Sequence, residues 1–170
     1  MARELCVLKS VLPGRREALA ATLAGLPGGD ASPLARVPGT HFARWVVAPS
    51  LRRQSDLGPD TACLVFAVEF DHRNATEYLE DVRRRLPDEA DSVWRHCAGY
   101  PGAVDHRFVS WLLAHRVEPG FSIVAFPSAT VAEVREALGL RARLAAFALA
   151  AQRTPTEGLR KAWREHVGAE

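Results

Sequence analysis

The chain has 170 residues, of which 48% are hydrophobic, and it carries a formal net charge of +2 at pH 7. This length suits one domain with a hydrophobic core and is short for two. Because acidic and basic residues are interleaved and no apolar run approaches the ~18 residues of a membrane-spanning helix, we expect neither a nucleic-acid partner nor a membrane.

The first residues and the cysteines indicate a reducing compartment. The opening MARELCVLKS has charged residues and no long apolar run, which argues against a signal peptide. Cys6, Cys63 and Cys97 are widely spaced and include no CxxC pair, so they predict free thiols rather than disulfides or a zinc site. We therefore expect a cytoplasmic protein without a metal site. Only Lys9 and Lys161 among the 22 basic residues are lysines, an arginine excess typical of GC-rich bacterial genomes.

Three strands and one helix are predicted in the first half of the chain. Residues 4–11 are predicted to be the first strand, and residues 41–48 the second, whose side chains alternate between two faces. Between them, Pro13 opens a helix whose leucines recur at helical spacing and which ends at a Pro-Gly-Gly sequence. Residues 62–70 are apolar on both faces, which is typical of a central strand covered on both sides. The polar stretch 49–60 predicts a long hairpin connection.

Several helices are predicted after the third strand. Asn74 and Glu77 form a capping box for a helix that ends near Pro87. Residues 88–116 predict an insertion of two short helices that are joined by a Gly-Tyr-Pro-Gly turn. One face of the second of these helices carries Val104, Phe108, Trp111, Leu112 and His115.

The last part of the chain predicts one more strand and two helices. Residues 121–126 are predicted to be the fourth core strand. Thr130 caps a further helix that Gly139 interrupts, and Thr154 with Pro155 opens a terminal helix.

This order of elements predicts an α+β fold with a ferredoxin-like βαββαβ core in a single domain over residues 1–170, in which one antiparallel sheet has helices on one face. The opposite face then needs a cover. The insertion 88–116 can supply it within the chain, or a second copy can pack sheet to sheet, and we expect a homodimer. Both arrangements leave a concave space for a small organic molecule.

Several short motifs resemble a little-characterised group of bacterial ferredoxin-like proteins of the dimeric α/β barrel superfamily, some of them associated with haem peroxidase-type domains. The motifs lie between about residues 36 and 140 and are His41-Phe42-Ala43-Arg44-Trp45, Phe70-Asp71, Trp94 to Pro101, His115 and Phe126-Pro127. The superfamily includes cofactor-free monooxygenases, haem enzymes and binding proteins, so the resemblance implies several classes of function. Dye-decolourising peroxidases have a Gly-x-x-Asp-Gly turn, and both glycines are absent around Asp71.

Two polar residues on the second predicted strand are candidates for chemistry. His41 begins this strand at a sheet edge, where its imidazole can act as a general base or simply bond to backbone. Arg44 lies between apolar neighbours, so under a cover its guanidinium needs an anion, either Glu69 or Asp71 of the protein or the acidic group of a ligand. Regular alternation places His41 and Arg44 on opposite faces unless a bulge re-aims one of them.

The remaining candidates lie in the insertion. His96 and Cys97 are at a helix end beside a rigid turn, but adjacent residues on a helix point about 100° apart, which does not suit a Cys/His nucleophile pair. We predict that His41, Arg44 and His96 converge on one cavity as catalytic residues. His115, on an apolar helix face, is a candidate haem ligand or a satisfied core histidine.

Three functions remain open from the sequence. The first is a small-molecule enzyme of oxidative type, from secondary metabolism, with its substrate in the cavity of the ferredoxin-like fold. The second is a non-catalytic ligand-binding or partner module, and the third is a cofactor-free lyase, cyclase or isomerase. Phosphate loops, zinc spacings, nucleophile elbows and dinucleotide fingerprints are absent from the sequence, so no motif selects among the three.

Overall fold

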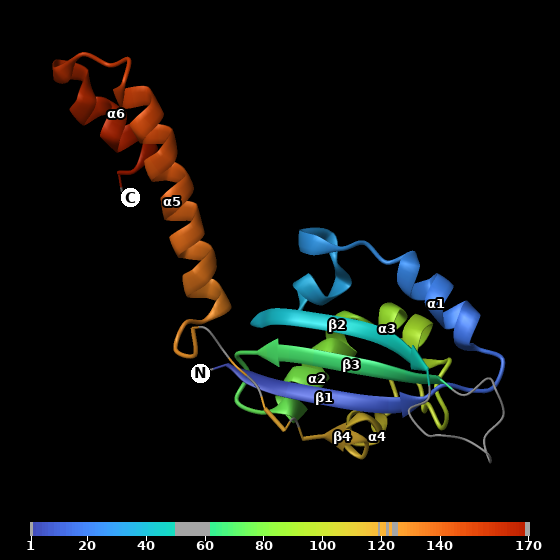
Figure 1. The fold of residues 1–170 in the computed structure, drawn as a ribbon. Helices are drawn as coiled ribbons and strands as arrows, with labels where there is room; N and C mark the ends of the chain where they lie inside the picture. The colour runs from blue at the N-terminus through green and yellow to red at the C-terminus, as the bar shows by residue number, and fades with distance from the viewer. Residues whose placement is uncertain (1, 50–61, 119, 122, 124–125, 169–170) are drawn as a thin grey trace. The chain divides into compact units, whose positions relative to one another are not determined.

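A computed structural model describes residues 2–49, 62–118, 120–121, 123 and 126–168 (Figure 1). These residues form two compact units, residues 1–128 and residues 129–170, which are described separately. The predicted hairpin connection at 49–60 lies outside the described residues, except for Pro49 at the end of a strand.

The first unit is a mixed α+β structure with a four-stranded antiparallel sheet. Its strands are β1 (Arg3–Ser10), β2 (Thr40–Pro49), β3 (Ala62–Phe70) and β4 (Arg116–Val117), in the spatial order β2-β3-β1-β4. The three long strands lie close to where the sequence predicts them. Buried and half-buried residues alternate along β1 and β3, because successive side chains point to opposite faces of the sheet.

The helices of this unit lie on one face of the sheet (Figure 1). They are α1 (Arg16–Ala24), α2 (Ala75–Arg85), α3 (Pro87–Trp94) and α4 (Phe108–Leu113), with short 3₁₀ turns at Gly29–Ala31 and Pro33–Arg36. The predicted cap of α2 is confirmed, since Asn74 Oδ1 accepts a hydrogen bond from the Glu77 amide at 2.9 Å. This bond satisfies one of the amides that a helix start leaves without a partner.

An aromatic cluster joins the sheet to the insertion helices. The fully buried Trp94 of α3 lies 5.5 Å from Phe66 of β3 and 5.4 Å from Phe108 of α4, both measured between ring centroids and both roughly edge to face. Trp45 of β2 lies 5.6 Å from both Phe66 and Trp94. Large aromatic rings contribute most of the buried apolar area of such a core, so this cluster fixes α3 and α4 under the sheet.

The opposite face of the sheet carries no helix among the described residues of this unit. The insertion 88–116 therefore does not supply the predicted cover, because its helices pack on the face that α1 and α2 already occupy. The expectation that β3 is covered on both sides is wrong for the same reason. Val65, Ala67 and Glu69 on its second face are only half-buried. We refer to this side of the sheet as the open face.

The fourth strand is not where the sequence predicts it. The described residues of 121–126 are Phe121, Ile123 and Phe126, and they are 73–86% exposed and not in a strand. The edge of β1 is taken instead by β4, which follows α4 directly. The Leu8 amide donates to the His115 carbonyl at 3.1 Å, so the chain reaches this edge as soon as α4 ends.

The second helix of the insertion is shorter than predicted. α4 has six residues, and both Val104 and His115 lie outside it and are exposed. Phe108 and Leu112 are buried as expected. The predicted apolar face of five residues is therefore wrong at its two ends.

The second unit is a pair of helices. α5 (Val131–Ala151) begins with the predicted capping box between Thr130 and Glu133, and it continues through Gly139, so the predicted interruption is wrong. One glycine costs a helix only about 1 kcal/mol, which 21 residues tolerate. A 3₁₀ turn (Thr156–Gly158) leads into α6 (Leu159–His166), and Trp163 packs edge to face on Phe147. No helix in the described part of the chain has the length and hydrophobicity to cross a membrane.

The aromatic cluster gives a direct test of the fold. Phe66 is 1% exposed and Phe126 is 73% exposed, so the same substitution should have very different effects at the two positions. We expect Phe66→Ala to lower the free energy of unfolding by about 3–5 kcal/mol and Phe126→Ala to change it by less than about 0.5 kcal/mol. Urea denaturation measures both. Equal effects would contradict the described core.

Candidate functional site

The three predicted catalytic residues lie in three different places. His41 is at the start of β2, where the register pairs Thr40 with Phe70. His96 is near the far end of the sheet, because its carbonyl accepts from the Leu12 amide, just beyond the end of β1. Arg44 is on the open face. The prediction that they converge on one cavity is therefore not supported by the described structure.

His41 is held by an acid of the protein. A register shift between Thr40 and Phe42 marks a bulge at His41, and His41 Nε2 lies 2.6 Å from Asp71 Oδ1. The bulge that the alternation required is present, but it turns the imidazole to Asp71 rather than to Arg44. Both side chains are about one-fifth exposed, so a half-buried histidine–carboxylate contact lies at one end of the sheet.

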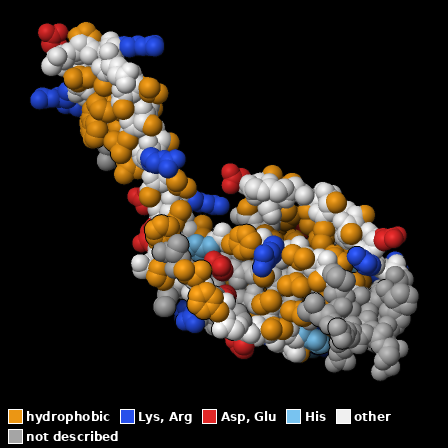
Figure 2. Space-filling model, in the orientation of Figure 1, with side chains coloured by type: hydrophobic (Ala, Val, Ile, Leu, Met, Phe, Trp, Pro, Cys, Tyr) orange, Lys and Arg blue, Asp and Glu red, His pale blue; other side chains and the backbone are white. Residues whose placement is uncertain are grey.

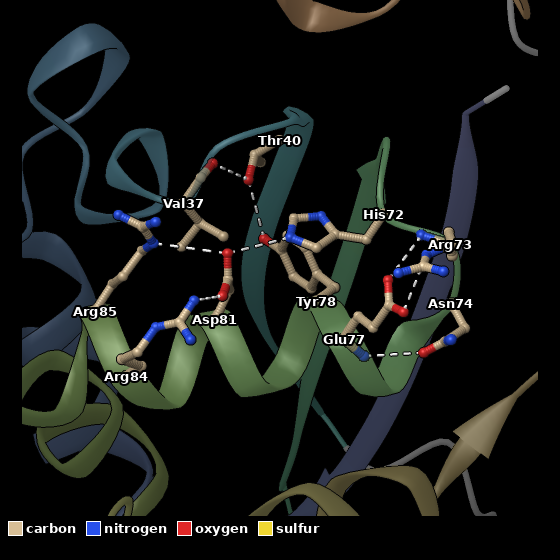
Figure 3. A network of polar contacts seen from close by, with 10 residues as sticks. All are labelled: Val37, Thr40, His72, Arg73, Asn74, Glu77, Tyr78, Asp81, Arg84 and Arg85. Atoms are coloured by element: carbon tan, nitrogen blue, oxygen red, sulfur yellow. Dashed lines mark hydrogen bonds and ion pairs between the residues drawn. The ribbon is translucent and has the colours of Figure 1, made fainter.

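A polar network next to this pair joins β2 to α2 (Figure 3). The Thr40 hydroxyl donates to the Val37 carbonyl at 2.8 Å and lies 3.2 Å from the Tyr78 hydroxyl. His72 Nε2 lies 3.3 Å from Asp81 Oδ2. Burial raises the pKa of Tyr78 to about 12, so its hydroxyl stays protonated at neutral pH. We interpret the network as a structural link, since the hydroxyls of Thr40 and Tyr78 and the Nε2 atom of His72 have partners within the protein, whereas His72 Nδ1 is buried without one among the described residues.

His96 and Cys97 are buried, and burial keeps both side chains in their uncharged forms. His96 is 4% exposed, and burial, followed by the charges of Arg95 and Arg15, lowers its pKa. It is therefore neutral at pH 7, and its Nε2 has no hydrogen-bond partner among the described residues. Burial also raises the pKa of Cys97 to about 12, so the thiol is protonated and unreactive.

Arg44 lies within the apolar part of the open face. Hydrophobic side chains gather on this face over the three long strands (Figure 2). Arg44 lines a shallow hollow of about 230 Å³, and its guanidinium carbon is 5.8 Å from the centre of the Phe42 ring. Among the described residues, no carboxylate lies within 4 Å of its nitrogens. The protein acids predicted to pair with Arg44 do not do so at this distance.

Two carboxylates flank the same hollow. Glu4 of β1 and Glu69 of β3 are directly opposite each other in the β1–β3 register, and both line the hollow with Arg44. Like charges in this cross-strand position repel each other. The hollow therefore combines one cation, two acids and an apolar floor that includes Cys6 and Ala67.

Lys9 is a site residue that the sequence analysis missed. It is on the covered face of β1, in line with the buried Leu5 and Val7, and is only 2% exposed. Its Nζ donates to the Trp111 carbonyl, lies 2.7 Å from His115 Nδ1 and is 3.7 Å from the centre of the Trp111 ring. An ammonium group buried in a core strand is unusual, and here its neighbours are a base and an aromatic face.

The burial of Lys9 changes its acidity. Desolvation lowers its pKa to about 8, and the nearby Cys97 only partly offsets this effect. The sequence does contain a feature that could have pointed to Lys9. It is a lysine at a position of the strand where an apolar residue is expected, in a chain whose other basic residues are nearly all arginines.

His115 does not fit its predicted role as a haem ligand. Its side chain is exposed at the corner between α4 and β4, not enclosed on an apolar helix face. Its Nδ1 contacts the Lys9 amine, which would place a cation beside the iron. We therefore assign no step to haem.

Comparison with known protein families, with curated proteins and with solved structures finds no match to this chain. The function is therefore inferred from the open face and from the contacts of Lys9 with Trp111 and His115.

Lys9 makes the stability depend on pH. Its pKa is about 8 in the folded chain and about 10.5 in the unfolded chain, so between these values only the unfolded chain binds the proton. The free energy of unfolding should therefore rise as the pH rises through this window. Lys9→Met should remove this rise and add about 1–3 kcal/mol of stability at pH 7, because no ammonium is buried.

Urea denaturation at pH 7, 8, 9 and 10 measures both effects. Lys161→Met is the control, because the Lys161 side chain is 82% exposed and should not change the pH profile. An unchanged rise in Lys9→Met would contradict the assignment.

Proposed function

We propose that this chain is a non-catalytic ligand-binding module of the ferredoxin-like type, and that its open face binds a small organic acid. The strand order β2-β3-β1-β4, with α1 between β1 and β2 and three helices between β3 and β4, supports the ferredoxin-like assignment. The short β4 and the additional helices are its departures from the simplest βαββαβ unit.

The observation that carries the proposal is the position of Arg44. It is an exposed arginine within an apolar sheet face, without a carboxylate within 4 Å among the described residues. When this face is covered, the guanidinium loses water and needs an anion. A carboxylate fits its planar fork with two parallel hydrogen bonds, and an apolar ligand body fits Phe42 and Ala67 in the same hollow.

A second copy of the chain is the proposed cover. Large apolar side chains are exposed on or beside the open face, among them Phe42 (50%), Val46 (42%) and Phe121 (86%). Apolar patches of this kind mark interfaces. A two-fold dimer would bring the same face of each copy together and enclose two hollows, each with its own Arg44.

The oxidative-enzyme interpretation loses its main support. It required His41, Arg44 and His96 around one substrate, but His41 pairs with Asp71 and His96 is buried at the other end of the sheet. A binding role needs only Arg44 and the apolar hollow, both of which are present.

Binding of small carboxylates tests the role of Arg44. Benzoate, phenylacetate and octanoate combine an acid with an apolar body, and we expect at least one to bind the wild-type protein in isothermal titration calorimetry. Arg44→Gln should weaken this binding by about tenfold or more, because a charge-assisted pair is lost. Arg16→Gln, at an exposed arginine on α1, is the matched control. Equal affinity of Arg44→Gln and wild type would exclude this site.

Light scattering tests the proposed dimer. We expect twice the chain mass of 18.6 kDa at micromolar concentration. Val46→Glu places a charge on the open face and should give a monomer, whereas Val104→Glu, at an exposed position outside the sheet, should leave the dimer intact. A wild-type monomer would contradict the second copy as the cover.

A further inference from the structure

We propose that Lys9 is a reactive amine that forms an imine with a small aldehyde or ketone, and that His115 is the base that accepts its proton. This site is independent of the open face, because Lys9 points to the opposite, covered side of the sheet. The proposal therefore adds a second binding site, which holds its ligand covalently, to the binding role of the open face.

The geometry places the three groups that such a reaction needs at one point. The amine nitrogen of Lys9 lies 2.7 Å from His115 Nδ1, which is hydrogen-bonding distance for direct proton transfer. The Trp111 ring lies 3.7 Å from the amine and forms an apolar wall beside it. The Trp111 carbonyl accepts a hydrogen bond from the amine and fixes its position.

Imine formation balances with these groups alone. His115 accepts a proton from the ammonium, and the neutral amine attacks the carbonyl carbon to form a C–N bond. The nitrogen, which carries a positive charge after the attack, passes one of its protons to the carbonyl oxygen, which becomes a hydroxyl group. His115 then returns a proton to this hydroxyl, water leaves, and the nitrogen lone pair forms the C=N bond. No oxidant or reductant is required.

Burial prepares the amine for this reaction. With a pKa of about 8, roughly a quarter of the Lys9 side chains are neutral at pH 7.5, compared with about one in a thousand for an ordinary lysine. Twenty of the 22 basic residues are arginines (22 minus Lys9 and Lys161), and arginine cannot lose its proton in a protein. A methionine or leucine would fill the same core position without the cost of a buried charge, so the amine itself is the feature to be explained.

The His115 ring is the entry point. The backbone of this corner is held by the hydrogen bond from the Leu8 amide to the His115 carbonyl and by the pairing of Arg116 with Val7. The His115 side chain, in contrast, is exposed. It can therefore turn aside about its own side-chain bonds and expose Nζ without breaking the sheet.

Reductive trapping tests the amine in the unmodified protein. Acetaldehyde or pyruvate is added with sodium cyanoborohydride at pH 7.5, and peptide mass spectrometry gives the labelling rate at each lysine. Lys161 is the internal control, because its side chain is 82% exposed and it is the only other lysine. We expect Lys9 to be labelled about tenfold or more faster than Lys161 with at least one probe. Labelling of Lys9 at the same rate as Lys161, or more slowly, with both probes would show a structural lysine and overturn the proposal.

His115→Gln tests the role of the base. Glutamine retains a polar side chain but cannot carry the proton, so the Lys9 rate should fall about tenfold or more while the Lys161 rate stays constant. Circular dichroism checks that the variant is folded. An unchanged or faster Lys9 rate in the folded variant would mean that the ring only covers the amine, and the assignment of His115 as base would be wrong.

Discussion

The packing of Trp94 against Phe66 is the contact on which the arrangement of the first unit depends. It fixes the insertion helices on the face of the sheet that α1 and α2 also cover. As a result, every described helix of residues 1–128 lies on the same face of the sheet. The opposite side is left with apolar residues, Arg44 and the carboxylates Glu4 and Glu69, so the buried cluster determines which surface is available for binding.

The two faces of the sheet give cations opposite environments. Arg44 keeps its charge on the open face, where it can pair with an anion from outside the chain. Lys9 is in the core, where burial favours the neutral amine. Arginine is suited to the open face because it binds carboxylates as a permanent cation. Lysine is suited to the core site because, unlike arginine, it can lose its proton and become a nucleophile.

The sequence was most informative where one short-range signal decides the structure. The three long strands followed from their short apolar runs, one of them alternating, and α2 and α5 from the caps at Asn74 and Thr130. It failed where tertiary contacts decide. Residues 116–117 occupy the edge of β1 because α4 brings them there, although 121–126 has the stronger strand pattern. The site residues were chosen by type, and sequence could not show that Asp71 holds His41 or that Lys9 meets His115.

If the open face binds an organic acid through Arg44, an added acid should perturb the residues of that face. Two-dimensional nitrogen-15 NMR of the uniformly labelled protein, titrated with benzoate, tests this expectation most directly because it locates the ligand. We expect shifts of the Arg44 side-chain Nε–H and of the backbone amides of Cys6 and Ala67, which line the same hollow. Shifts confined to residues of α2 or α3, on the covered face, would contradict the account.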